Sequence, residues 1–317
     1  MYSEDDHSLD FYKRDRKPEV GETFNGKAVT KIYNVSESSN SSFGYGSGVK
    51  TVEVVDDGIK PVTTHGWFMY HGDIKSANLE KLDTSQVASM GNMFYYVGFE
   101  HIDLSTWDTS NVTDMTCMFS NCAGLTSLDL SGWDTSSVTD MGNMFSNCTG
   151  LTSLDLSGCN VSNVTNMNGM FSNCSSLTNL DLSGWDTGNV TDMGSETGMF
   201  SDCSGLTSLD LTDWDVSKVK YMRDMFKGCS GLTSLDLTDW NVSSVDTMYQ
   251  MFNECSSLTT VGDLSDWNTG NVTNMYSVFY DCQKLAANCS NWDVANVSSH
   301  DWFNDNAPGV IPPNWNS

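Results

Sequence analysis

The sequence predicts an α/β solenoid: a right-handed stack of coils with short parallel strands on one face, short helices on the other, and a small β-rich cap at the N-terminus. Two observations predict it. From Phe99 to about Gly309 one 26-residue unit recurs eight times, and Leu125 to Gly150 is its clearest copy, LTSLDLSGWDTSSVTDMGNMFSNCTG. Apolar residues hold the same places in successive copies, and a unit this short cannot bury its own apolar face. The copies must therefore stack and share one continuous core.

The start of each unit predicts a strand. In LTSLDL, residues 125–130, the aliphatic residues at 128 and 130 alternate with Ser127 and Asp129. This period of two is typical of a short strand with one buried face. Trp133 follows the strand, and a polar segment comes next that we expect to form a loop held by one inward residue, Val138.

The second half of each unit predicts a short helix. Met141, Met144, Phe145 and Cys148 have the spacing i, i+3, i+4, i+7, which places them on one stripe of a helix. Thr139 or Asp140 suits its N-terminal cap, and the acidic residue also suits the positive end of the helix dipole. Roughly eight to ten residues are too few for a helix that is stable alone, so packing against neighbouring coils must hold it. A methionine stripe can form an adaptable binding surface, but its recurrence in every coil favours core.

Ten cysteines allow two interpretations. Seven occupy one position of successive units, and identical positions imply identical burial, which favours a row of buried thiols. Disulfides between coils are the alternative. The seven are Cys122, Cys148, Cys174, Cys203, Cys229, Cys255 and Cys282.

A tryptophan row also allows two interpretations, since it follows the strand at the rim of each coil. The rings are either buried at this edge or form an exposed aromatic shelf for a ligand. In the second case Trp133 and Trp185 are candidate partner-binding residues. The row comprises Trp107, Trp133, Trp185, Trp214, Trp240, Trp267 and Trp292.

Aspartates form the candidate functional row, because the residue between the two buried leucines of a strand points outward. Stacked coils bring these carboxylates to roughly 5 Å from each other, where each adjacent pair repels by about 0.8 kcal/mol in water. Hydrogen bonds from nearby Ser side chains and backbone amides, bridging hard cations such as Ca²⁺, or a basic partner can offset this repulsion. No metal site or cofactor is assigned on this basis. The row comprises Asp103, Asp129, Asp155, Asp181, Asp210 and Asp236.

Four regions are expected along the chain. Residues 1–20 form an extended charged arm, and residues 21–81 form the β-rich cap, with a hairpin over Thr30 to Val55. Residues 82–309 form the solenoid, a degenerate coil followed by eight repeats, and residues 310–317 form a tail. An insertion at residues 194–198 predicts a local bulge.

The excess of acidic residues excludes some classes of binding partner. The chain has 41 acidic and 15 basic residues, and none of the basic ones lies between Leu82 and Ser217. Such a surface cannot neutralise phosphates, so nucleic acid and anionic membranes are poor partners. No apolar run is long enough to insert into a membrane, and we find neither a signal peptide nor an anchor in the given chain. The five His are dispersed and no catalytic motif occurs, so we expect no enzyme.

The combined motif LxxLDLSxWDTSxVTxMxxMFxxC resembles the BspA-like leucine-rich repeat proteins of bacterial surfaces, from Leu82 to about Asp293. The preceding VTKIYNV and VKTVEVVDDGIKP resemble the cap segment of that family. The resemblance implies a leucine-rich-repeat-like solenoid, an extracellular or cell-surface location, and adhesion.

We therefore expect a non-enzymatic binding or adhesion module that presents its acidic repeat face to a protein or glycan. The alternative is a structural component of a larger assembly, such as a virion appendage or a surface filament, with neighbouring copies as partners.

Overall fold

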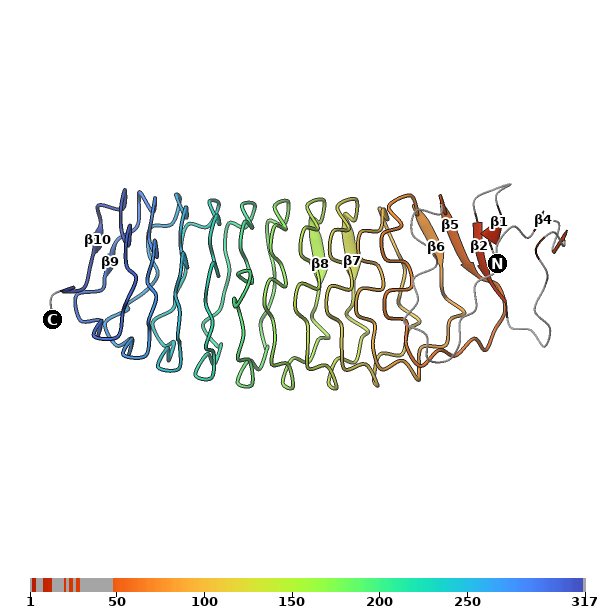
Figure 1. Cartoon of the computed structure of the whole chain (residues 1–317), viewed down its shortest axis with the longest axis horizontal. Helices are drawn as coiled ribbons and strands as arrows, with labels where there is room; N and C mark the ends of the chain where they lie inside the picture. Colours follow the sequence, from red (N-terminus) through yellow and green to blue (C-terminus); the bar gives the residue numbers. More distant parts are fainter. Residues whose placement is uncertain are drawn as a thin grey trace.

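The computed structural model describes residues 2–3, 8–12, 20, 23–24, 27–28 and 48–315. In these residues the chain forms an elongated stack of coils, each coil being one turn of the chain about the long axis (Figure 1). The coils follow one another in chain order, from the end that carries β5 to the end that carries β10. The predicted leucine-rich-repeat-like solenoid is confirmed in its strands and its stacking, but not in its helices.

Short parallel strands stack in register on one side of the solenoid. Strand β7, Ser127–Asp129, pairs with β8, Ser153–Asp155, and Leu128 lies opposite Leu154. At the C-terminal end β9, Ala287–Asn288, pairs in parallel with β10, Val310–Ile311. Residues that are 26 positions apart in the sequence therefore lie side by side in neighbouring coils, so equivalent residues of successive repeats stack on one another.

The same sheet-forming side continues toward the N-terminus. Strands β1 (Tyr2–Ser3), β2 (Ser8–Phe11), β5 (Thr51–Val54) and β6 (Ser76–Asn78) form one sheet in the order β1-β2-β5-β6. The pair β1 and β2 is antiparallel, and the other two pairs are parallel. A separate antiparallel pair joins β3, Thr23–Phe24, to β4, Lys27–Ala28.

Two predictions for the N-terminal region, the charged arm and the hairpin, can be compared with this sheet. Part of the segment expected to be a charged arm is β2, which pairs with β5 and buries Leu9 and Phe11. The second arm of the hairpin expected over Thr30 to Val55 is β5, which here pairs in parallel with β2 and β6. The first arm lies outside the described residues, and the domain boundaries stay predictions.

The predicted helices are wrong. Residues 48–315 contain no helix, and nothing in the described residues could cross a bilayer as one. Where a helix was expected, backbone N–H groups donate alternately to the next coil and to their own turn. Met141 N donates to Asn166 O at 3.0 Å, whereas Met144 N donates to Met141 O at 3.2 Å. Phe145 N again reaches the next coil, at Met170 O and 2.9 Å.

Left-handed residues explain why these turns do not become a helix. Asn143 and Asn147 have φ of 55° and 61°, which interrupts a right-handed helix every fourth residue. The i, i+3, i+4, i+7 stripe still points inward, because each turn of the chain brings its Met or Phe back to the core. The missed signal was the frequent Asn, Asp or Gly at these two positions, since those residues tolerate positive φ best. It is incomplete, because Cys117, Gln250 and Ser277 adopt the same φ at the first position.

A second ladder of parallel backbone bridges therefore replaces the helical side. It runs from coil to coil through single residues at the position of Asp140, without forming named strands. We call this row, with the turns that follow it, the second ladder. Its members are Ser89, Asp114, Asp140, Asn166, Asp192, Tyr221, Thr247, Asn274 and Ser299.

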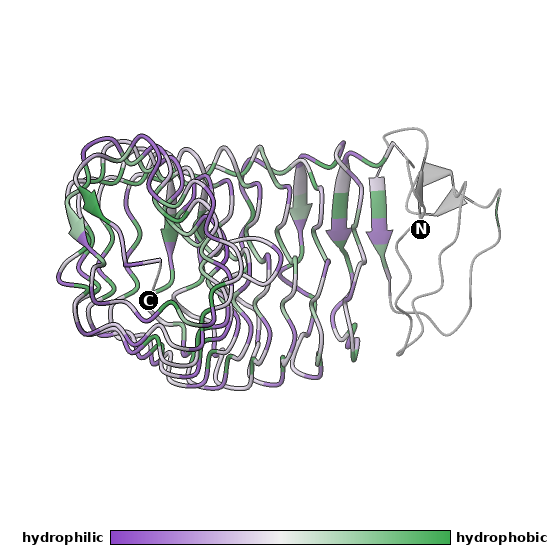
Figure 2. Cartoon of the chain, turned by 60° about the vertical axis from the view of Figure 1, so that its left-hand side comes forward, coloured by the Kyte–Doolittle hydropathy of each residue, from purple (hydrophilic) through white to green (hydrophobic). Residues whose placement is uncertain are grey.

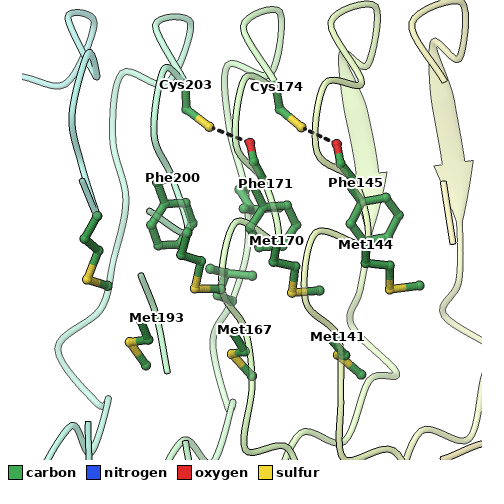
Figure 3. Packing of buried hydrophobic residues seen from close by; sticks show 14 of the residues in the cluster. Met141, Met144, Phe145, Met167, Met170, Phe171, Cys174, Met193, Phe200 and Cys203 are labelled. Atoms are coloured by element: carbon green, nitrogen blue, oxygen red, sulfur yellow. Dashed lines mark hydrogen bonds between the residues drawn. The ribbon is translucent and has the colours of Figure 1, made fainter. Parts of the chain in front are cut away.

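A column of stacked phenylalanine rings fills the core between the two ladders. Successive ring centroids lie 5.3 to 5.8 Å apart, with interplanar angles of at most 24°. Two methionine rows run beside the column (Figure 3). Apolar and polar residues alternate along the coils (Figure 2), and the apolar ones are those that are buried. The rings belong to Phe68, Phe94, Phe119, Phe145, Phe171, Phe200, Phe226, Phe252 and Phe279.

The predicted row of buried thiols is confirmed, because all ten cysteines are free and the seven of the row are buried. Each thiol of the row donates to the carbonyl of the Phe in the preceding coil; Cys174 Sγ lies 3.2 Å from Phe145 O (Figure 3). Burial raises the pKa of Cys122 to about 12. The row therefore links coils by hydrogen bonds rather than by disulfides.

Edge-on aromatic rings close both ends of the column. Phe11 of β2 packs edge-on against Phe68, with centroids 6.1 Å apart, and stacks on Trp67. Phe303 packs edge-on against Phe279 at 5.4 Å. These contacts cover the terminal ring faces, which no further coil of the described chain covers.

Candidate functional site on the strand face

The strand face is the side of the solenoid that carries the aspartate row. All six predicted aspartates are exposed there, and the register of β7 and β8 pairs Asp129 with Asp155. The structure adds a seventh member, Asp263, which Gly262 had displaced by one residue from its expected place in the sequence. Asp263 lies beside the preceding coil, since its N–H donates to Thr238 Oγ1 at 3.0 Å.

Hydrogen bonds within each turn stabilise these carboxylates. Asp129 Oδ1 accepts from Ser131 N at 2.9 Å and from Ser131 Oγ at 2.7 Å. The bonds from this serine hold the pKa of Asp129 below its usual value, although the charge of Asp103 opposes them. Thr238 lowers the pKa of Asp236 in the same way. Local hydrogen bonding therefore offsets part of the repulsion along the row, as one of the three interpretations held.

A second aspartate row lies where the chain leaves the strand face. Asp134 accepts from Ser136 N at 3.0 Å, which repeats the turn chemistry of the first row. Asp108 and Asp215 are bonded alike by Ser110 and Ser217. Asn160, Asn241 and Asn268 take the same position in other coils. The aspartates of this row have the same turn geometry as those of the first, so they serve as an internal control for it.

The strand face is hollowed along its length by two adjoining grooves. One, of about 850 Å³, extends from His101 to Asp181, and the other, of about 580 Å³, extends from Asn179 to Gly262. Both contain Asn179 and Asp181, so they adjoin in the same coil. Leucines form the floor, and the aspartate row stands along it. The hollow is acidic, open and elongated in the direction of the axis.

The tryptophan row does not form a ligand shelf. Trp133 and Trp185 are only 3% and 4% exposed, so these two candidate partner-binding residues were wrongly placed at the surface. Trp133 Nε1 donates to Leu104 O of the preceding coil at 3.4 Å, and its ring stacks on Trp107. The alternative, burial at the rim, is the one that the structure supports.

No group of three or more His, Cys, Asp and Glu side chains able to hold a metal is found in the described part of the chain. Bridging of neighbouring aspartates by Ca²⁺ needs only two carboxylates, so it stays an untested alternative among the three interpretations of the row.

One polar cluster joins residues that the sequence had left dispersed. Ser89 Oγ donates to Asp114 Oδ2 at 2.7 Å, and His65 Nδ1 lies 3.4 Å from Ser89 Oγ and 3.9 Å from Asp114 Oδ2. In a Ser-His-Asp triad the histidine stands between the other two. Here the serine is bonded directly to the aspartate, so the arrangement is that of neighbouring turn residues on the second ladder.

One family model matches the repeats. The family described as Mycoplasma protein of unknown function, DUF285, matches residues 64–154, 97–197, 126–226, 151–259 and 195–309. These overlapping matches span the coils that carry both ladders. No curated protein matches the chain significantly.

Three solved structures are similar to the chain at low identity. A leucine-rich repeat protein from Bacteroides ovatus ATCC 8483 has 14% identity and a TM-score of 0.35, over 94% of this chain and 82% of that one. TLR13 in its complex with ssRNA13 has 15% identity and a TM-score of 0.26, over 75% and 50%. The plant peptide hormone receptor RGFR1, in complex with RGF2, has 11% identity and a TM-score of 0.19, over 76% and 58%.

Proposed function

Since the chain belongs to the family described as Mycoplasma protein of unknown function, DUF285, we propose that this repeat solenoid is a non-enzymatic binding module whose strand face binds a basic segment of a partner protein. One observation carries the proposal: the aspartate row stands along an open hollow that runs through successive coils. A regular solenoid offers such an extended surface because every coil repeats the same side chains.

Charge and shape both favour a basic, extended partner segment. Six aspartates from successive coils line the hollow, at the spacing of parallel strands, about 4.8 Å. An extended segment with several Lys or Arg side chains meets more than one carboxylate at a time, whereas a neutral glycan leaves their charge uncompensated. Leucines between the polar rows supply apolar contact.

A labelled nona-arginine peptide tests the proposal by fluorescence anisotropy at near-physiological salt. Replacing Asp129, Asp155 and Asp181 together by Asn removes three charges but keeps an oxygen that accepts the turn hydrogen bonds. We expect binding to weaken about tenfold or more, since electrostatic contacts across an interface are lost.

The matched control replaces Asp108, Asp134 and Asp186 by Asn, which removes the same number of negative charges from the second aspartate row; Asp186 belongs to that row because it accepts from Gly188 N in the same way. It should weaken binding far less. Equal losses in the two triple variants would mean that the peptide responds to total charge, and the strand face would not be the site.

The BspA-like resemblance extends the proposal to an adhesin at a cell surface. Antibody labelling of unpermeabilised cells tests this location. Surface digestion should use a protease of broad specificity, because the absence of Lys and Arg between Leu82 and Ser217 makes that region resistant to trypsin. Labelling that appears only after permeabilisation would contradict the surface role.

A further inference from the structure

Three aromatic residues adopt a backbone conformation that disfavours them. Tyr70, Tyr96 and Trp302 have φ of 66°, 60° and 58°, in the left-handed region that bulky L-residues enter only at a cost. Burial does not offset this cost, since the three side chains are 44%, 55% and 55% exposed. A strained residue that does not serve the core is a candidate for a functional role.

Tyr70 and Tyr96 stand at the second left-handed position of successive turns, which is asparagine in the three coils that follow. The fold itself is therefore satisfied by asparagine at this position. Backbone bonds place neighbouring turns side by side: Tyr70 N donates to Tyr95 O and Tyr96 N to Ser120 O, both at 2.8 Å. The two tyrosines and the three asparagines thus form one row along the axis. The asparagines are Asn121, Asn147 and Asn173.

Three tyrosine rings meet at the N-terminal end of this row. Tyr70 packs edge-on against Tyr95, with centroids 5.1 Å apart, and lies 6.4 Å from Tyr96 at an angle of 45°. Tyr96 lies against Gly72, where a Cβ would be 3.7 Å from the tyrosine ring. Among the described residues no ring stacks face to face on Tyr96. Tyr96 therefore keeps an open ring face toward solvent.

The turns that carry this row contain no charged residue in five successive coils. The chain has 41 acidic and 15 basic residues, yet no Asp, Glu, Lys or Arg occurs in these turns. Glu196 and Asp202 end the series in the next coil. We call the five turns the uncharged strip. It comprises residues 66–72, 91–98, 116–124, 142–150 and 168–176.

The border of the strip is more acidic than basic, which disfavours an anionic ligand. Cations fit poorly at the tyrosines, because Lys75 Nζ lies 3.4 Å from the carbonyl of the same Gly72 that Tyr96 contacts. The carboxylates of Asp114 and Asp140 lie on the second ladder, where each already accepts a side-chain hydrogen bond. A neutral ligand therefore suits the strip. The border comprises Asp73, Lys75, Glu100, Asp114 and Asp140.

The polarity of the strip favours a saccharide over a protein. The centre of a protein interface is apolar, but Tyr70 and Tyr96 are the only large hydrophobic side chains exposed on the strip. Asn121 and Asn147 are half-buried, and each donates one amide N–H to the preceding serine. Their amides keep further capacity for sugar hydroxyls. A pyranose ring has C–H bonds on its face and hydroxyls at its edge, which matches an aromatic face beside amides.

We propose that the uncharged strip binds a neutral polysaccharide, separately from the strand face. One sugar ring lies on the open face of Tyr96, and the polysaccharide continues along the axis over Asn121 and Asn147. This role explains why tyrosine replaces asparagine at a strained position. The module then has two ligands, a basic protein segment on the strand face and a glycan on the turns of the second ladder.

Native gel electrophoresis tests the proposal, with hydroxyethyl cellulose, laminarin or a mannan cast into the gel. At least one of these neutral polysaccharides should retard the wild type. Tyr96→Asn should abolish the retardation, because the ring face is lost. The melting temperature of this variant should not fall, because asparagine adopts a φ of 60° more readily than tyrosine. Tyr96→Trp keeps an aromatic face and should still be retarded.

Tyr221→Asn is the matched control. Tyr221 is 37% exposed on the second ladder but lies outside the uncharged strip. Asn274 on the same ladder shows that asparagine fits this position. The control should be retarded as strongly as the wild type. Equal loss in Tyr221→Asn and Tyr96→Asn, or no retardation of the wild type by any of the three polysaccharides, would overturn the proposal.

Two further measurements separate other occupants. Retardation by heparin, but by none of the neutral polysaccharides, would identify an anionic glycan. Self-association in sedimentation velocity that Tyr96→Asn abolishes, without retardation in the gels, would identify a second copy of the chain. Either result would overturn the proposal as stated. Nona-arginine binding to the strand face should be unchanged by Tyr96→Asn, so the two surfaces are tested independently.

Discussion

At the scale of single residues, a few positions of the unit decide how the chain turns. Asn143 and Asn147 lie in the left-handed region, which L-residues other than Asn, Asp and Gly enter at a cost of roughly 1–2 kcal/mol. Equivalent residues in other coils do the same, among them Gly169 and Gly228 with φ of 62° and 68°. The turn in each coil therefore depends on residues that make no contribution to the apolar core.

Asn143 offers a clean test of this conformational role. Asn143→Ala should lower the free energy of unfolding by about 1 kcal/mol, because alanine resists positive φ. Asn143→Gly should cost clearly less, because glycine adopts the same φ without strain. Urea denaturation of the two variants measures the difference. A glycine variant as unstable as the alanine variant would mean that the side chain, rather than φ, matters.

At the scale of the repeated element, rows of equal side chains couple neighbouring coils. The thiol row does so through bonds such as that from Cys203 Sγ to Phe171 O, at 3.0 Å. Burial raises the pKa of each thiol of the row, to about 12 for Cys122 and Cys282, from an ordinary 9.0. The folded row thus binds its protons more tightly than the unfolded chain does.

Alkaline pH should therefore destabilise the solenoid through its thiols. Their contribution is complete below pH 9, where both states are protonated, and is lost as the pH rises from 9 toward 12. Each thiol costs at most about 1.4 kcal/mol per pH unit. Denaturation midpoints at several pH values measure the loss. A double variant with Cys122→Ala and Cys282→Ala should show a shallower decline above pH 9, and an unchanged slope would contradict the mechanism.

Bridging by Ca²⁺ was one interpretation of the aspartate row on the strand face. Because Ser131, Ser157 and their equivalents already donate to these carboxylates, we expect a chelator to leave the melting temperature unchanged. Thermal melts with and without EDTA, and with added Ca²⁺, decide the question. A midpoint that falls with EDTA and recovers with Ca²⁺ would establish bridging cations.

At the scale of the whole molecule, the core is a one-dimensional column rather than a globule. Within the column each phenylalanine ring stacks on the phenylalanine rings of the coils before and after it; Phe171 lies 5.8 Å from Phe145 and 5.7 Å from Phe200. In such an array stability is close to a sum of coil terms and nearest-neighbour terms. A defect should therefore act locally first.

Phe171→Ala tests this local coupling in the middle of the column. Removal of a fully buried ring should cost about 3–5 kcal/mol, and hydrogen exchange should accelerate most in the coils on either side of Phe171. Phe303→Ala, at the C-terminal end, is the control and should affect mainly the last coils. Uniform acceleration along the chain in both variants would indicate a single cooperative unit instead.

The sequence alone determined the stacking, its period and the outward row of aspartates. Repetition does this directly: Asp129 recurs 26 residues later as Asp155, and stacked coils must align them. The sequence also identified the buried thiols. Seven cysteines occupy the same position of successive units, so all seven must have the same environment. The family is confirmed at the level of the repeat, whereas the finer BspA-like resemblance stays a prediction.

Only the tertiary structure decided what lies opposite the strands, because Met141, Met144, Phe145 and Cys148 point inward equally from a helix or from successive turns. Backbone hydrogen bonds to the next coil favour the turns over a helix. These bonds cannot be predicted from the pattern of apolar residues, because that pattern is the same for both conformations. The burial of Trp133, the hollow along the aspartates and the pairing of Tyr70 with Tyr96 likewise depend on contacts between residues at least 24 positions apart.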